Sequence, residues 1–292
     1  MISKTSLGMI AAAMFGATLF AAPVSCLAEE PAAAAASHEG PIPARQDWSF
    51  AGFFGKYDQA QLQRGFQVFR EVCSNCHSAD HLAFRNLAEP GGPEFSIEQV
   101  KALAAQYNIK DGPNDAGDMF ERPGRPSDYW PSAFANANQA RTANSGALPP
   151  DMSVLAKARG IKRGFPWFIF EALPGFTYQE QGADYIVALM TGYEDEAPKG
   201  VTLDAGQNFN HYFPGNKLMM PKPLSDGQVA YTDGAPQTLQ QYSNDVAAFL
   251  MWTAEPKLDV RKKTGFRVLI VLAILAGLFY ATKKRIWADV QH

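Results

Sequence analysis

The sequence feature that most restricts the fold is an apolar run near the C-terminal end, GFRVLIVLAILAGLFYAT, from Gly265 to Thr282. Its one charged residue is Arg267, and clusters of basic residues flank it at 261–263 and 283–285. A helix of roughly 18–20 residues, at about 1.5 Å per residue, crosses the hydrocarbon core of a bilayer. A helix buried in a protein core is the alternative, but basic residues on both sides favour a membrane span. The run therefore predicts a transmembrane anchor.

The N-terminal end has the layout of a secretory signal peptide. Lys4 is the one charged residue before Glu29, and an apolar run follows it and leads to a stretch of small residues that ends in the small-x-small site Cys26-Leu27-Ala28. This order predicts export, with cleavage after Ala28. An uncleaved anchor and a lipidated Cys26 are the alternatives. The Ala- and Gly-rich run argues against the anchor, and the absence of a Leu three residues before Cys26 argues against lipidation. Export of the N-terminal part makes the C-terminal helix a stop-transfer anchor.

Charge divides the chain where the anchor begins. Residues 29–260 carry 28 acidic and 18 basic side chains, whereas residues 261–292 carry one acidic and seven basic. An acidic surface argues against nucleic acid and fits a cationic protein partner, whose approach it would steer. Solubility alone is the other explanation. The predicted regions are a signal peptide at 1–28, a flexible arm at 29–45, a periplasmic domain at 46–260, an anchor with basic flanks at 261–285 and a cytoplasmic tail at 286–292.

Several helices are expected in the exported part. Apolar residues recur at helical spacing from Asp58 to Cys73, so a helix would deliver Cys73 at its C-terminal end. Capping-box patterns precede two more helices, at 96–107 and about 239–253. A further helix is predicted at 182–193.

Two segments resist assignment to regular structure. Residues 111–150 are rich in Gly, Pro, Asn and Asp and predict a long irregular loop, which is unusual unless the loop has a function such as covering a cofactor. Residues 160–180 are dense in aromatics. We expect these aromatics to pack on the domain, with the membrane interface or another subunit as alternatives.

The residues Cys73-Ser74-Asn75-Cys76-His77 form the pattern through which haem is attached to c-type cytochromes. Two cysteines at this spacing can reach the two vinyl groups on one porphyrin edge, and the adjacent histidine then lies under the iron. A thioredoxin-like Cys-x-x-Cys would need a βαβ setting, and a zinc site would need a second ligand pair. Neither accompanies the motif. One motif predicts one covalently bound haem c with His77 on the iron.

The residues alone leave the sixth ligand of the iron open. Met219 and Met220 stand in a non-helical segment, LMMPKPL, that Pro221 and Pro223 stiffen. His211 is the main competitor. A methionine–histidine pair raises the reduction potential and leaves no site for oxygen, which is typical of an electron carrier. An open or labile sixth position would instead indicate a tethered haem sensor.

Long, ordered blocks of the sequence resemble the cytochrome c1 family, the haem subunits of cytochrome bc1 complexes. The resemblance runs from about Trp48 to Trp287, and its blocks include GKYDQAQLQRGFQVFREVCSNCH, ANSGALPPDMSVLAKAR, NFNHYFPGNKLMMPKPL and FLMWTAEPKLDVRKKTGF. It implies a mainly α protein, with a class I cytochrome c-like haem domain, long loops and a single C-terminal transmembrane helix.

The resemblance also implies the residues of the haem site. Cys73 and Cys76 would form the thioethers, His77 would be the proximal ligand, and Met220 would be the sixth ligand. Arg159 would meet a haem propionate through a charge-assisted hydrogen bond. The other implied residues would line the haem pocket or lie next to it, namely Asn144, Pro149, Pro150 and Tyr185.

The same resemblance implies electron transfer during quinol oxidation. Haem c would take an electron from the Rieske iron–sulfur protein and pass it to a soluble c-type cytochrome, in a complex that includes cytochrome b. The subunit itself would be a non-catalytic redox carrier, because catalysis belongs to the complex. It would sit in the bacterial inner membrane as a single-pass protein, with its haem domain on the periplasmic side. A stand-alone anchored cytochrome serving another enzyme is the alternative.

Overall fold

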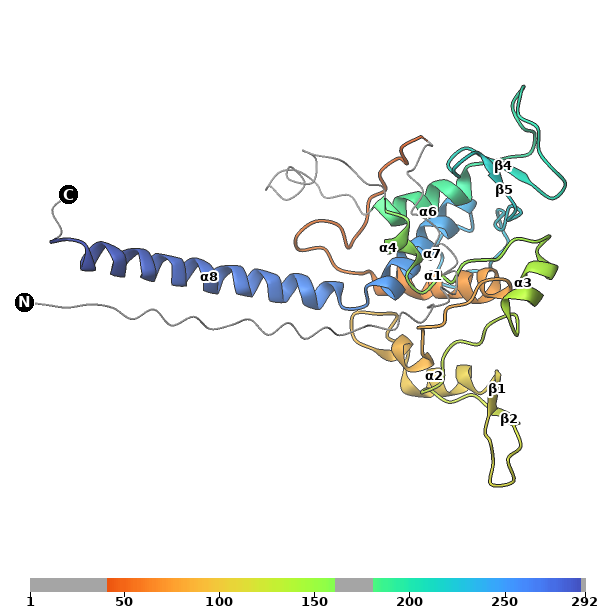
Figure 1. The fold of residues 1–292 in the computed structure, drawn as a ribbon, viewed down its shortest axis with the longest axis horizontal. Helices are drawn as coiled ribbons and strands as arrows, with labels where there is room; N and C mark the ends of the chain where they lie inside the picture. Colours follow the sequence, from red (N-terminus) through yellow and green to blue (C-terminus); the bar gives the residue numbers. More distant parts are fainter. Residues whose placement is uncertain (1–40, 161–180, 290–292) are drawn as a thin grey trace, which may run out of the picture. The chain divides into compact units, whose positions relative to one another are not determined.

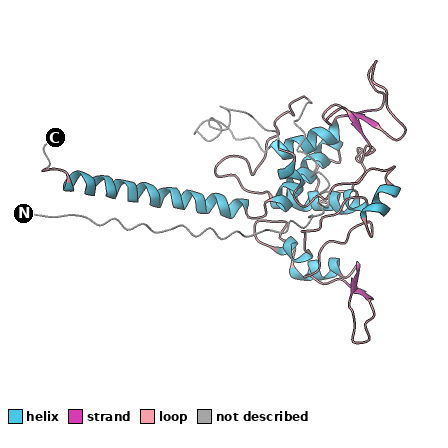
Figure 2. Ribbon diagram, in the orientation of Figure 1, coloured by secondary structure: helices cyan, strands magenta, loops and turns pink. Residues whose placement is uncertain are grey.

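The structure, a computed structural model, describes residues 41–160 and 181–289. These residues are mostly helical, with a few short strands (Figures 1 and 2). The mainly α fold with one long apolar C-terminal helix is therefore confirmed. The predicted signal peptide, most of the arm and the aromatic residues of 160–180 lie outside the described residues.

The helices and strands alternate with long connecting segments (Figure 2). The helices are α1 (Gln59–Glu71), α2 (Ile97–Ala104), α3 (Ala137–Ala143), α4 (Leu155–Ala158), α6 (Gln181–Thr191), α7 (Leu239–Ala254) and α8 (Leu258–Ile286), with 3-10 turns η1 (Cys73–Asn75) and η2 (Phe84–Ala88). The strands β1 (Asn108–Asp111) and β2 (Phe120–Pro123) form an antiparallel hairpin. A second antiparallel sheet has the order β3 (Tyr193–Glu194), β4 (Asn208–Asn210) and β5 (Lys217–Leu218).

Helices α1 and α7 pack against each other at the centre of the core (Figure 1). The rings of Phe66 and Phe69 on α1 lie 5.6 and 5.5 Å from the ring of Phe249 on α7. The crossing is close because α1 has Gly65 there: a Cβ on this residue would lie 2.0 Å from the backbone oxygen of Asp245. Burial of each of these aromatic side chains stabilises the fold by roughly 1.5–3 kcal/mol.

Helix α6 packs against α7 and α4 in the same core (Figure 1). Its first turn approaches α4 so closely that a Cβ on Gly182 would lie 1.6 Å from the backbone oxygen of Ala156. Ile186, Val187 and Met190 are buried on α6. Glycines thus allow close approach where α1 crosses α7 and where α6 meets α4, and the four helices pack into one unit.

Two buried carboxylates join this core to segments that are distant in sequence. Asp245 on α7 is fully buried and accepts hydrogen bonds from Arg64 Nε and from the Tyr231 hydroxyl, both at 2.9 Å. Asp184 on α6, also fully buried, accepts from Trp48 Nε1 at 2.7 Å. Because a buried charge without partners is strongly unfavourable, these contacts fix the chain around both carboxylates.

The predicted helix starts are largely correct. Ser96 and Gln99 form the full reciprocal capping box at the start of α2. At α7 only half of the predicted box forms: Thr238 accepts from the Gln241 backbone N–H, but the Gln241 side chain donates to Asp245 instead. The helix expected at 182–193 is observed as α6, shifted toward the N-terminus by one or two residues.

The prediction of an irregular loop over 111–150 was wrong in part. The segment contains most of the β1–β2 hairpin and helix α3. Arg122 on β2 joins the two strands through an ion pair with Asp111 on β1, and a second ion pair with Asp128 ties β2 to the segment that follows it. The hairpin was missed because its strands are four residues each, none of them buried, and carry adjacent charged residues instead of a clear alternation of apolar and polar ones.

Helix α8 leaves the core at its first residue. Leu258 is fully buried, whereas the residues from Val260 to Asp289 are exposed apart from the half-buried Lys262. Within the described part of the chain, α8 is the one helix long and apolar enough to cross a membrane. It contains the predicted anchor at 261–285, and the chain is a single-pass membrane protein.

Candidate functional site

The Cys-x-x-Cys-His motif forms a tight turn directly after α1. The backbone N–H groups of Cys76 and His77 both donate to the Cys73 carbonyl, at 3.1 and 3.0 Å. Ser74 Oγ and Asn75 Nδ2 donate to carbonyls in the last turn of α1, at 2.8 and 2.9 Å. The end of the helix therefore holds the motif in one conformation.

The two cysteines of this turn lie in different surroundings. Cys73 is buried against the core, and burial raises the pKa of its thiol to about 12, with Cys76 adding to the effect. Cys76 is exposed. Neither cysteine is committed to a disulfide. One cysteine of the motif thus faces the protein interior and the other faces outward.

The ring of His77 is oriented by a residue far along the chain. Its Nδ1 lies 2.8 Å from the Pro150 backbone oxygen. A carbonyl can only accept, so this contact places the ring proton on Nδ1 and leaves the Nε2 lone pair available for a metal. His77 is 8% exposed, and burial lowers the pKa of its imidazole, which favours the neutral form that ligates iron.

Asp151 links the segment that carries Pro150 to the segment that follows His77. The Asp151 carboxylate accepts hydrogen bonds from Ser78 Oγ at 2.9 Å, from the Asp80 N–H at 2.8 Å and from the Ser153 N–H at 2.9 Å. Burial alone would raise the pKa of this carboxyl, but the hydrogen bonds outweigh burial and hold the pKa below its usual value. Asp151 therefore fixes the distance between the His77 turn and the Pro150 carbonyl.

Met220 is held mainly through its backbone. Its carbonyl accepts from the Tyr193 hydroxyl at 3.1 Å and from Asn208 Nδ2 at 3.4 Å. Its side chain is half-buried and packs against the hydrophobic core. The methyl group of Met219 points elsewhere, lying 3.4 Å from the position that a Cβ would take on Gly206.

Tyr185 and Arg159 are close enough to interact electrostatically. Tyr185 is buried on α6, and burial raises the pKa of its hydroxyl, while the positive charge of Arg159 opposes that shift. Burial also raises the pKa of Tyr193, and Tyr185 adds to that effect. Tyr193 thus connects Tyr185 to Met220, although the sequence analysis did not select it.

The other predicted residues lie at a helix end and in the loop after it. Asn144 is half-buried at the C-terminal end of α3, where its Nδ2 donates to the Ala140 carbonyl at 2.7 Å. Pro149 is half-buried. The next residue after Asn144, Ser145, lies beside Gly206 together with the Met219 methyl group. The α3 end and the methionine segment therefore meet at Gly206.

His211, the competing candidate for the iron ligand, contacts Glu194 at the protein surface. Its Nε2 lies 2.6 Å from Glu194 Oε1, and its side chain is 45% exposed. The antiparallel pairing of β3 with β4 creates this contact, since Glu194 lies opposite Phe209.

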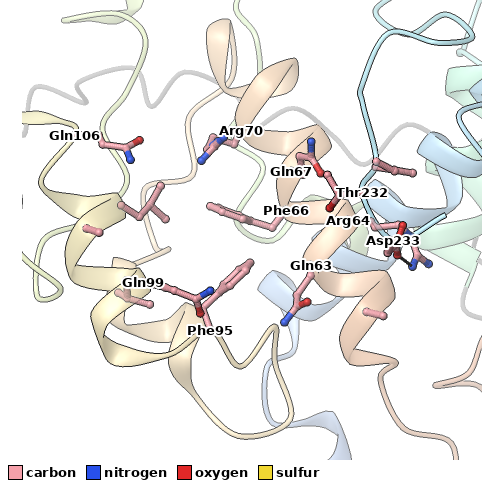
Figure 3. Close-up of a pocket in the computed structure, with 15 residues that line it drawn as sticks. Gln63, Arg64, Phe66, Gln67, Arg70, Phe95, Gln99, Gln106, Thr232 and Asp233 are labelled. Carbon is pink, nitrogen blue, oxygen red and sulfur yellow. Dashed lines mark hydrogen bonds and ion pairs between the residues drawn. The ribbon is translucent and has the colours of Figure 1, made fainter. Parts of the chain in front are cut away.

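A groove of about 510 Å³ lies elsewhere on the domain, between α1, α2 and the loop at 231–233 (Figure 3). Phe66 and Phe95 form part of its apolar lining, and several glutamine side chains line it as well (Figure 3). None of the predicted site residues lines this groove. It is therefore separate from the candidate haem site.

The arrangement fits a c-type haem. Cys73 and Cys76 offer two thiols on one turn, in the sequence spacing of a haem-attachment motif, and His77 offers an oriented neutral nitrogen. The structure brings His77 to Pro150, Arg159 to Tyr185, and Met220 to Tyr193. Asp151 and Tyr193 were missed because their roles depend on contacts with residues far away in the sequence.

Comparison with known proteins agrees with this chemistry. The model of the cytochrome C1 family matches residues 48–290. A Bradyrhizobium diazoefficiens protein named cytochrome b/c1 is 60% identical over 85% of this chain, which spans 36% of that longer protein. Cytochrome c1 of Blastochloris viridis is 50% identical, with 86% of this chain and 89% of the relative covered. The cytochrome b-c1 complex catalytic subunit of Candida albicans mitochondria is 40% identical, with 88% and 81% covered.

Proposed function

The chain belongs to the cytochrome c1 family, and from this premise we propose that it is the electron-transfer subunit of a cytochrome bc1 complex. The observation that carries the proposal is the fixed geometry of His77. Its Nδ1 is committed to the Pro150 carbonyl, and two thiols stand on the same turn. This is the combination that a covalently attached haem needs.

The cofactor of the family is a c-type haem, and we propose that this chain carries one, attached through Cys73 and Cys76. When bound, a haem supplies reversible one-electron chemistry at its iron. The protein's part is to hold His77 neutral and in one orientation. Arg159 is proposed to face a propionate, and Asn144, Pro149, Pro150 and Tyr185 to surround the porphyrin.

Met220 is the proposed second ligand of the iron. Three observations support it over its competitors: its side chain packs against the core, the Met219 methyl group lies beside Gly206, and the ring of His211 is paired with Glu194. A thioether opposite a histidine stabilises the reduced iron and so raises the potential. It also closes the iron to external ligands, which suits a carrier.

We propose that this subunit accepts electrons from the Rieske iron–sulfur protein and delivers them to a soluble c-type cytochrome. The relative whose name joins cytochrome b and c1, and of which this chain matches about a third, supports cytochrome b as a neighbour in the same complex. The excess of acidic residues over 29–260 fits a cationic acceptor. The signal-like N-terminal sequence supports a periplasmic domain with α8 in the inner membrane.

A haem stain on a denaturing gel, followed by a reduction titration of the same preparation, tests the attachment. We expect colour that stays with the denatured chain and a single redox transition. The variant Cys73→Ala/Cys76→Ala should lose the stain. Complete extraction of the colour into acidified organic solvent would refute covalent attachment.

Two further measurements test the role as a carrier. Reduced protein should bind carbon monoxide only very weakly, whereas ready binding would favour a haem sensor. The chain should also co-purify with cytochrome b from membranes, and purification without it would favour a stand-alone anchored cytochrome. The rate of electron delivery to the acceptor should fall at high ionic strength, because the charges involved are exposed.

A further inference from the structure

Three phenylalanines form an exposed cluster where the domain meets the membrane-spanning helix. The rings of Phe53 and Phe54 lie 6.1 and 5.4 Å from the ring of Phe266 on α8, in edge-on geometry, and 5.2 Å from each other. Phe53 is 54% exposed, Phe54 is 73% exposed and Phe266 is 41% exposed. We refer to these residues as the phenylalanine cluster. In water, so much exposed aromatic surface at one point would be unfavourable.

The loop that carries Phe53 and Phe54 is held at both ends. At its start, the Phe50 carbonyl accepts from Lys262 Nζ of α8, and the Phe50 ring is fully buried. At its end, the Tyr57 hydroxyl lies 3.2 Å from the carbonyls of Met251 and Glu255. The two aromatic side chains are therefore directed outward by a fixed loop.

The position of Phe266 along α8 indicates the depth of the phenylalanine cluster relative to the bilayer. From Phe266 to Trp287 the helix rises about 32 Å at 1.5 Å per residue, close to the roughly 30 Å of a hydrocarbon core. At the far end, Lys284 Nζ lies 5.7 Å from the ring centre of Tyr280, and Trp287 follows. Aromatic residues paired with basic ones mark the boundary of a bilayer. Phe266 thus lies at the opposite boundary.

We propose that Phe53 and Phe54 insert into the boundary region of the bilayer beside α8 and form a second attachment of the domain to the membrane. Because their rings contact Phe266, they share its surroundings. The exposed side chains of Lys56 and Lys263 complement anionic lipid headgroups at this level. The occupant of this surface is lipid, and its continuity with a helix that lies in lipid favours that over a protein partner. The inference requires only that α8 spans the membrane, and not the proposed redox role.

A photo-crosslinking experiment in native membranes tests this inference. A benzophenone side chain is introduced into the full-length chain at position 54 and, in a second variant, at position 53. Both sites are exposed, so the substitution preserves the core. The reference for lipid contact is the same group at Phe279, which is 70% exposed in the apolar part of α8. The matched control is Met119 in the loop between β1 and β2, which is 64% exposed.

Phospholipid adducts are expected at positions 53 and 54, with yields comparable to that at 279 and several-fold above that at 119. Adducts with another polypeptide at 53 and 54 would show that a protein occupies the surface and would overturn the inference. Yields at the level of position 119, with normal labelling at 279, would overturn it as well, because the rings would then face water.

Discussion

The two sides of the candidate haem site are built differently. On the attachment side, the segments 73–81 and 150–153 are joined by several hydrogen bonds, centred on Asp151 and including the contact of His77 Nδ1 with the Pro150 carbonyl. On the methionine side, Met220 is held through its backbone carbonyl by Tyr193 and Asn208. One side is fixed by a dense network and the other by a loop with few restraints.

This difference separates two properties of the site. The network determines whether the histidine is in place, so its loss should affect folding and haem incorporation together. If Met220 is the second ligand as proposed, its loop determines how firmly the thioether is held, so changes there should alter the potential while attachment survives. With the proposed attachment and ligation, such a protein would keep its cofactor permanently and still adjust its redox behaviour through a loop.

The largest effect is expected on the methionine side from Met220→Leu. Haem should stay attached, but the reduction potential should fall by on the order of 0.1–0.3 V. This is a fraction of the range of roughly 0.8 V over which axial ligands set haem potentials. Carbon monoxide should then bind the reduced protein. The matched control is Met219→Leu, which should change neither. Both variants are measured by redox titration and by spectra of the reduced protein. An unchanged potential and spectrum in Met220→Leu would indicate that Met219 or His211 is the ligand instead.

On the attachment side, Asp151→Ala should reduce both stability and haem incorporation. It leaves the Ser78 hydroxyl and the N–H groups of Asp80 and Ser153 without their acceptor, at about 1–3 kcal/mol for each buried group that stays unpaired. Thermal unfolding and the haem-to-protein ratio are the measurements. Asp80→Asn, at an exposed neighbour, is the control and should behave as wild type. If Asp151→Ala instead changed only the potential, the proposed division between the two sides would fail.

A smaller effect is expected from Tyr193→Phe. It removes one hydrogen bond to the Met220 carbonyl, worth about 1 kcal/mol, so the affinity of the reduced protein for carbon monoxide should rise on the order of fivefold. Attachment and thermal stability should change little. A carbon monoxide titration measures the change, with Tyr129→Phe, at a 54% exposed tyrosine, as the control. No difference between the variants would show that Tyr193 does not restrain the ligand.

A pH-dependent effect of a few tenths of a kcal/mol is expected from Glu255→Gln. Glu255 joins Lys157 on α4, directly after the attachment side, to Arg261 on α8. Burial would raise the pKa of Glu255, but these cations outweigh burial and lower it. Its stabilisation is therefore present above the pKa of the unfolded chain, about 4.3, and is lost as pH falls through the lower pKa of the folded state.

Partial exposure keeps this contribution of Glu255 small. Unfolding in detergent should accordingly separate wild type from the Glu255→Gln variant at pH 7 and bring them together in acid. A gap that widened in acid would contradict the assignment.

The smallest effect is expected from His211→Gln. Its ring is paired with Glu194 at the surface, so the spectrum and the potential should stay at wild-type values. A fall in potential matching that of Met220→Leu would identify His211 as the ligand and would reverse the assignment of the two sides.

Local patterns in the sequence were sufficient for several features. The haem motif, the apolar anchor and the capping box of α2 each depend on residues within a few positions or within one helix. Such features have a fixed spacing, and spacing is visible in a sequence. The hairpin β1–β2 was missed because its exposed strands lack that kind of pattern.

Contacts across the chain were decided by the tertiary structure alone. Pro150 orients His77 although 73 positions separate them in the sequence, and Tyr193 restrains Met220 from 27 positions away. The ring of Phe54 contacts that of Phe266 although most of the domain's sequence lies between them. A hydrogen bond or ring contact between distant segments has no period, because it depends on how whole helices pack. The sequence therefore determined that this chain has a haem-attachment motif and a membrane anchor. The packing of the helices, with the close approach at Gly65 as one example, determined which distant side chains contact the histidine, the methionine and the proposed membrane-facing phenylalanines.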